Sequence, residues 1–106
     1  MTATAPAATT NDLPWLKKYP AAVKWDTKFE PKPLWRILDD AVSTFPDTML
    51  IDFLGKTYTY AEVGDLVNKA AKGFQSIGVG KGVKVGLFLP NCPQFLISYF
   101  GILKAG

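Results

Sequence analysis

The segment from Pro93 to about Lys104 constrains the fold most, because it is a short predicted helix with apolar side chains in nearly every direction. These side chains are Phe95, Leu96, Ile97, Tyr99, Phe100, Ile102 and Leu103. A helix that is apolar on all sides lies inside a larger protein or in a membrane, and a membrane span needs about 20 residues. We therefore expect this short helix to lie inside a larger protein, because the elements predicted before it in the chain are not enough to cover it.

An amphipathic helix and a hairpin are predicted in the middle of the chain. Apolar residues recur at helical spacing over 34–45, and Pro46 ends that helix. The recurring residues are Leu34, Ile37, Leu38, Ala41, Val42 and Phe45. Segments 48–53 and 57–60 have the character of two short strands joined by a turn at 54–56.

A second helix is predicted to begin after Thr59. Glu62 lies three residues further on, which makes a capping box, and Gly78 is a natural end to the helix. One face carries the apolar residues Val63, Leu66, Val67, Ala70, Phe74 and Ile77.

The apolar run 83–89 is typical of a strand buried on both faces of a parallel sheet. Asn91 is the expected N-cap of the last helix, Gln94 occupies the capping-box position, and Pro93 suits the first turn. A parallel strand should follow this helix, and the chain stops where that strand should begin. The predicted fold class is α/β, an incomplete part of a larger domain.

The first third of the chain differs in composition. Residues 1–12 are poor in large apolar side chains and are expected to form a disordered leader. Residues 13–33 mix aromatic and basic residues with prolines, and we expect an extended arm that places its aromatic side chains on another surface. The start of the folded domain is expected at residue 34.

Composition excludes several classes of function. The net charge of +3 is too small for a nucleic-acid-binding surface. The chain has no histidine, so a Ser–His–Asp triad, a Cys–His pair and a histidine-based zinc site cannot form within it. No run is long enough to cross a bilayer and no signal peptide is recognisable, so the expected location is cytoplasmic.

Two motifs suggest chemistry but are better explained by structure. The run GVGKG at 78–82 has the wrong spacing for a phosphate-binding loop, lacks a following Ser or Thr, and lies after a helix instead of before one. Cys92 lies at the start of a helix, where a thiol can be activated. Because no histidine can partner it, we interpret it as a small packing residue.

Other candidate groups have similar structural explanations. Asp39 and Asp40 are adjacent on a helix and point in different directions, so they are interpreted as a solvated face and not as an acid–base pair. Leu96, Tyr99 and Phe100 could line an acyl tunnel, but core packing is the simpler interpretation.

Trp15, Lys17 and Lys18 form an aromatic and basic cluster that suits the headgroup zone of a membrane. The alternative is an arm packed on its own protein or across a homodimer interface. We favour the alternative because no amphipathic helix of useful length accompanies the cluster. Peripheral membrane contact stays open.

Several motifs resemble those of the adenylate-forming, or AMP-binding, enzymes. TYTYAE at 57–62 is similar to the first core motif of that superfamily, and LKAG at 103–106 is similar to the start of the second. LFLPNCPQ at 87–94 and YFGILKAG at 99–106 add to the resemblance. WLKKYP at 15–20 and FGILKAG at 100–106 resemble the bacterial long-chain fatty-acid–CoA ligases. One position differs from this resemblance: residue 83 is a valine here, whereas the relatives commonly have an acidic residue after the Lys–Gly pair at 81–82.

The resemblance implies the first part of a large N-terminal domain and a two-step reaction. A fatty acid attacks ATP to give an acyl-adenylate and pyrophosphate, usually with Mg²⁺, and coenzyme A then displaces AMP. That chemistry requires a Ser/Thr/Gly-rich phosphate loop, an acidic residue for ribose and a mobile lysine. None of these motifs occurs here, so no catalytic, cofactor-binding or metal-binding residue is assigned, and the 106-residue chain alone is expected to be inactive.

Two other functions remain open at this stage. The whole protein could be another adenylate-forming ligase that acts on a short, aromatic or amino-acid carboxylate. The chain could also be a self-sufficient, non-catalytic binding or scaffolding module. Oligomeric state and chain-length preference are not readable from these residues.

Overall fold

The computed structural model describes residues 13–106, so the leader predicted at 1–12 lies outside the described residues. The chain divides into two compact units, Met1–Pro31 and Lys32–Gly106. Each unit is described by itself. Along the described chain no helix is long and apolar enough to cross a membrane.

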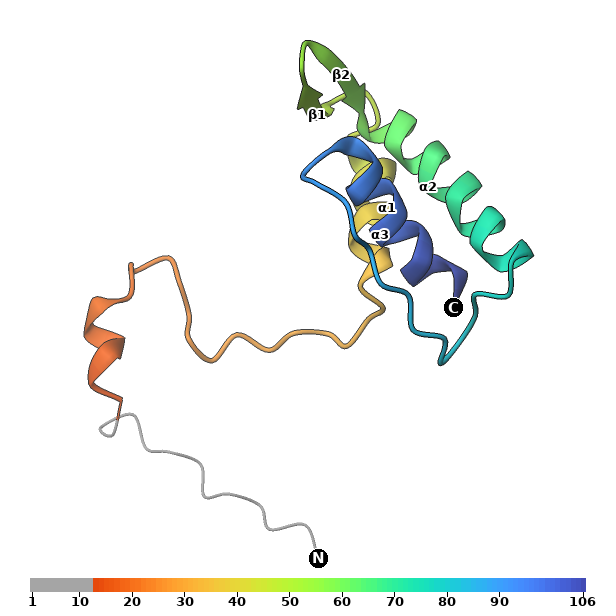
Figure 1. The fold of residues 1–106 in the computed structure, drawn as a ribbon. Coiled ribbons are helices and arrows are strands. Elements are labelled where there is room, and N and C mark those ends of the chain that lie inside the picture. The colour runs from red at the N-terminus through yellow and green to blue at the C-terminus, as the bar shows by residue number, and fades with distance from the viewer. Residues whose placement is uncertain (1–12) are drawn as a thin grey trace, which may run out of the picture. The chain divides into compact units, whose positions relative to one another are not determined.

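The first unit contains one 3₁₀-helix, η2 (Pro14–Lys18), shown in orange in Figure 1. Pro14 opens it, which suits a position whose N–H would have no helical partner. The Leu16 N–H donates to the Leu13 carbonyl at 3.1 Å, and the Tyr19 N–H donates to the Leu16 carbonyl at 3.2 Å. Five residues of the segment expected to be extended are therefore helical, and 19–31 has neither helix nor strand.

The second unit begins with helix α1 (Trp35–Thr44), close to the predicted 34–45. Leu38 is buried on the core side of this helix. Three residues of the predicted apolar stripe are instead exposed, namely Leu34, Ile37 and Phe45. The helix was therefore predicted correctly, but the described elements cover only part of its stripe.

Strands β1 (Met49–Phe53) and β2 (Lys56–Thr59) form the predicted antiparallel hairpin. Leu54 and Gly55, at the turn, both have positive φ, 49° and 81°. A two-residue turn with positive φ at both positions matches the right-handed twist of the strands it joins. Glycine adopts this backbone at little cost, whereas leucine rarely does.

Helix α2 (Tyr60–Ser76) begins at the predicted capping box. The Glu62 N–H donates to Thr59 Oγ1 at 3.2 Å, and the Thr59 N–H donates to Glu62 Oε2 at 2.8 Å. Val63 and Val67 are the most deeply buried side chains of the described chain. Burying a side chain of this size contributes about 1.5–3 kcal/mol, so this face of α2 is the centre of the core.

The strand predicted at 83–89 is wrong: residues 77–92 contain neither helix nor strand. A strand needs a neighbour for its N–H and C=O groups, and β1 and β2 form a two-stranded sheet with each other. Val83, Phe88 and Leu89 are exposed, Phe88 fully. The segment therefore has the composition of a buried strand without a strand beside it.

Helix α3 (Pro93–Ala105) begins after Cys92. Pro93 occupies the first turn as predicted. The N-cap predicted at Asn91 is wrong, and the capping box with Gln94 does not form, because Cys92 is the cap and its side chain makes no capping hydrogen bond.

The core lies where α1, α2 and α3 meet, with the hairpin at one end (Figure 1). Its buried residues are Leu38, Val63 and Val67, and partly buried side chains from the hairpin and α3 pack around them. Gly101 of α3 lies so close to α2 that an added Cβ would meet Ala70 Cβ at 2.9 Å.

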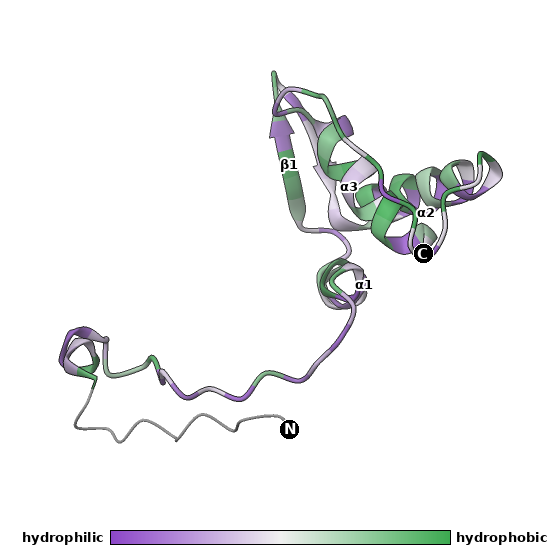
Figure 2. Ribbon diagram, turned by 60° about the horizontal axis from the view of Figure 1, so that its bottom comes forward, coloured by the Kyte–Doolittle hydropathy of each residue, from purple (hydrophilic) through white to green (hydrophobic). Residues whose placement is uncertain are grey.

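As the sequence indicated, the described elements do not cover α3 on all sides. Figure 2 shows long hydrophobic stretches of this helix. Pro93, Gly101 and Ala105 are buried, but the larger apolar side chains are only half-buried and Tyr99 is exposed. The described elements therefore cover one side of α3 and leave apolar surface on the other.

Candidate functional site

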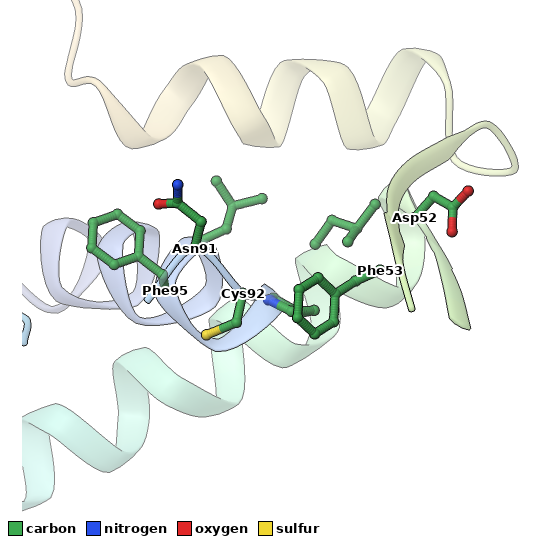
Figure 3. Close-up of a pocket in the computed structure, with 8 residues that line it drawn as sticks. Asp52, Phe53, Asn91, Cys92 and Phe95 are labelled. Atoms are coloured by element: carbon green, nitrogen blue, oxygen red, sulfur yellow. The ribbon is translucent and has the colours of Figure 1, made fainter. Parts of the chain in front are cut away.

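A shallow hollow of about 240 Å³ lies between the hairpin and the start of α3 (Figure 3). It is lined by Ile51, Asp52, Phe53, Asn91, Cys92, Pro93, Phe95 and Leu96. Most of these side chains are apolar, and the Asp52 carboxylate points away from Asn91, Cys92 and Phe95. The hollow offers packing surface and no converging set of polar groups.

Cys92 is the only thiol of the chain and lies half-buried at this hollow. Its backbone is extended, with φ of −144°, and its position is set by the Pro90–Pro93 segment that leads into α3. The packing role that the sequence suggests for Cys92 fits its neighbours Phe53 and Pro93.

The glycine turn at 78–82 ends α2. The Gly78 N–H donates to the Gln75 carbonyl at 3.1 Å, and the Val79 N–H donates to the Phe74 carbonyl at 3.0 Å. Gly78 and Gly82 have φ of 95° and 85°, a conformation that favours glycine. Gly78 therefore closes a helix and Gly82 lies in the turn that follows, where the Val83 N–H donates to the Gly80 carbonyl at 3.0 Å. As the sequence context indicated, this run is a structural turn and not a phosphate-binding loop.

Asp39 and Asp40 diverge, as expected for neighbours on a helix. Asp40 accepts a hydrogen bond from Lys32 Nζ at 2.8 Å on the exposed face. That hydrogen bond lowers the pKa of Asp40, and the nearby charges of Lys32 and Arg36 lower it further. The interpretation as a solvated face is confirmed for Asp40.

Asp39 instead joins two helices. Lys104 Nζ donates to both carboxylate oxygens of Asp39, at 2.7 and 2.8 Å, and lies 5.6 Å from the centroid of the Trp35 ring. A partly desolvated cation over an indole face is attractive. This three-residue contact was missed by the sequence argument because its partners are 65 residues apart and share no local pattern.

Leu96 and Phe100 pack against the buried core, so the prediction of core packing is confirmed for both. It is wrong for Tyr99, which is 38% exposed. The Tyr99 ring stacks on Phe95 with centroids 6.5 Å apart and meets Phe100 edge-on at 5.4 Å.

Within residues 13–106, no three Cys, Asp or Glu side chains are close enough together to hold a metal ion. The glycine turn is a helix end and the hollow beside Cys92 is apolar, so neither of them fits the triphosphate of ATP. No residue is therefore assigned to ATP, Mg²⁺ or coenzyme A.

Comparisons with known proteins agree with the motifs at 57–62 and 99–106. The family described as AMP-binding enzyme matches residues 38–106. A long-chain-fatty-acid–CoA ligase of Bacillus subtilis is 41% identical over 93 residues, which is 88% of this chain and 17% of the ligase. A crotonobetaine/carnitine–CoA ligase of Salmonella paratyphi A is 32% identical over 78 residues, 69% of this chain and 15% of that enzyme.

The chain thus spans about one sixth of the length of the curated relatives that it matches. No solved structure gives a significant match. The matched family region, 38–106, contains most of α1 and all of the hairpin, α2 and α3. The chain belongs to the AMP-binding enzyme family.

Proposed function

We propose that the chain is the N-terminal part of an ATP-dependent fatty-acid–CoA ligase located in the cytoplasm. The whole enzyme would join a fatty acid to AMP with release of pyrophosphate, and would then transfer the acyl group to the thiol of coenzyme A with release of AMP. Mg²⁺ would serve the first step. The 41% identity over 93 residues to a long-chain-fatty-acid–CoA ligase carries this proposal.

The length of that match adds support. Since it covers 88% of the chain, it must reach into the segment before residue 32. The family match, in contrast, begins only at residue 38. The similarity to the fatty-acid ligase therefore extends beyond the region common to AMP-binding enzymes in general.

In this proposal the catalytic groups lie outside these 106 residues. Other residues of the whole protein complete the α/β domain. Exposed apolar residues support this: Val83, Phe88, Leu89 and Tyr99 leave a hydrophobic face on the second unit. An exposed patch of this kind marks a surface that binds something. We propose that later parts of the same large domain cover it.

A second candidate is a CoA ligase for another carboxylate, because crotonobetaine/carnitine–CoA ligases are also 32% identical. The whole protein should be assayed with ATP, Mg²⁺ and coenzyme A against palmitate, crotonobetaine, acetate, benzoate and an amino acid. Pyrophosphate release and thioester formation should be greatest with palmitate. A clear preference for any of the other acids would contradict the fatty-acid proposal.

The 106-residue chain should be assayed in parallel. We expect no pyrophosphate release from ATP and palmitate, because the described residues contain no phosphate site. Release above that of a palmitate-free control would contradict the proposal that the catalytic groups lie elsewhere.

A further inference from the structure

The first unit exposes a cluster of aromatic and basic side chains on and beside η2. None of the residues of η2 is buried. Trp15 is 52% exposed, Tyr19 is 43% exposed, and Lys17 and Lys18 are exposed beside them. This arrangement leaves both large aromatic surface and positive charge available to a partner.

The 3₁₀ geometry brings the two kinds of side chain together. Residues three apart lie on the same side of a 3₁₀-helix, so Trp15 and Lys18 share one side of η2. Together with Tyr19 and Pro20 they line an open hollow of about 420 Å³. The hollow is therefore a mixed surface, with apolar walls and a lysine beside them.

All charged side chains within residues 13–25 are positively charged. Residues 13–25 contain Lys17, Lys18 and Lys24 and no acidic residue, although Asp12 directly precedes this segment and Asp26 directly follows it. Trp25 adds a second indole, 46% exposed. A partner that fits this surface is negatively charged and accepts the amphipathic rings of Trp and Tyr.

The sequence alone favoured packing of this arm on protein; from the exposed rings and lysines of the first unit we infer instead that residues 13–25 bind the surface of a membrane that contains anionic lipids. Trp and Tyr rings favour the boundary between headgroups and acyl chains, and lysines near an anionic leaflet are attracted to it. This inference is independent of the proposed ligase activity, because it concerns only the first unit and its affinity for lipid.

Charge favours a lipid surface over the two protein surfaces that this chain itself offers. A second copy of the same segment would bring three lysines against three lysines. The unit Lys32–Gly106 has eight basic and six acidic residues, so it too is net positive. Neither protein surface complements residues 13–25 overall, whereas phosphatidylserine-containing membrane does.

Cosedimentation of the 106-residue chain with vesicles tests the inference. Phosphatidylcholine vesicles with phosphatidylserine should bind the chain, and pure phosphatidylcholine vesicles should bind it much more weakly. A K17Q/K18Q variant should lose about 25-fold in affinity for the anionic vesicles, since each lysine contributes about fivefold. Added salt should weaken binding by the wild-type chain.

The control is K72Q/K84Q, which removes the same charge from two exposed lysines of the second unit. It should bind nearly as well as wild type. Equal binding of K17Q/K18Q and wild type, or a loss in the control as large as in K17Q/K18Q, would overturn the inference. Adsorption through apolar surface of the second unit would leave K17Q/K18Q bound as tightly as wild type.

Fluorescence locates the contact. In a W25F/W35F variant Trp15 is the only tryptophan, and its emission should shift to the blue when anionic vesicles are added. No shift on binding would overturn the role of Trp15. A blue shift that appears without vesicles and grows with protein concentration would indicate self-association and would also overturn the inference.

Discussion

At the scale of single residues, close contacts between helices matter more than charged groups on the surface. Gly101 and Gly64 let α3 and α1 approach α2, because an added Cβ would meet Ala70 Cβ or Val42 Cγ2 at 2.9 Å. The contact between Asp39 and Lys104 ties α1 to α3. We therefore expect substitutions at these two glycines to change the free energy of unfolding more than substitutions of charged groups on the surface.

Substitution of Gly101 by valine should destabilise the second unit by about 1–3 kcal/mol, because the added methyl groups would overpack the α2–α3 contact. The control is G73A on α2, where an added Cβ meets nothing within 4 Å. It should stabilise by about 0.5–1 kcal/mol through helix propensity. Urea unfolding followed by circular dichroism measures both. A neutral G101V would contradict the described helix contact.

The lowered pKa of Asp40 predicts an acid-sensitive contribution to stability. A carboxyl group whose pKa is lower in the folded than in the unfolded state stabilises the fold above the unfolded value, here 3.8, and this contribution disappears as pH falls through the folded value.

The K32M variant removes the main cause of that shift. Its melting temperature should lie slightly below that of wild type at neutral pH, and the two should converge in strong acid. The difference should be small because the pair is exposed. A gap that widens on acidification would contradict the assignment.

At the scale of elements, the sequence predicted correctly the features that depend only on residues close together in the chain. The capping box at Thr59 and Glu62, the hairpin around Gly55 and the helix end at Gly78 each depend on neighbours within a few residues, and each forms. The strand at 83–89 depends on a partner strand, which the described elements do not supply. The cap at Asn91 failed because the turn into α3 runs one residue later.

The candidate functional residues also divide into those whose role depends on local geometry and those whose role depends on distant partners. The divergence of Asp39 and Asp40 and the role of the turn at 78–82 could be predicted, because both follow from local geometry. The contact of Lys104 with Asp39 and Trp35 could not, because it needs the tertiary packing of α1 against α3.

The cap of α2 can be tested directly. T59A should destabilise the second unit by about 1 kcal/mol, because the Glu62 N–H loses its acceptor. T59S keeps the hydroxyl and should retain most of the stability. Thermal unfolding of the two variants and wild type distinguishes them. Equal losses in T59A and T59S would show that the hydroxyl does not act as a cap.

At the scale of the whole molecule, the second unit combines a small buried core with exposed apolar side chains on α3 and on the segment before it. A self-sufficient binding module would unfold cooperatively and expose little apolar surface. A part of a larger domain should bind a hydrophobic dye at low temperature, before it unfolds.

Thermal unfolding of the 106-residue chain with such a dye separates these two possibilities. We expect dye binding before unfolding begins. A sharp transition with little dye bound at low temperature would favour the non-catalytic module.

We propose that these residues begin an AMP-binding fatty-acid–CoA ligase whose catalytic groups come later in the chain. Sequencing the gene past the codon for Gly106 tests it most directly. The account predicts an open reading frame that continues into a Ser/Thr/Gly-rich loop with a lysine. A stop codon directly after Gly106 would contradict it.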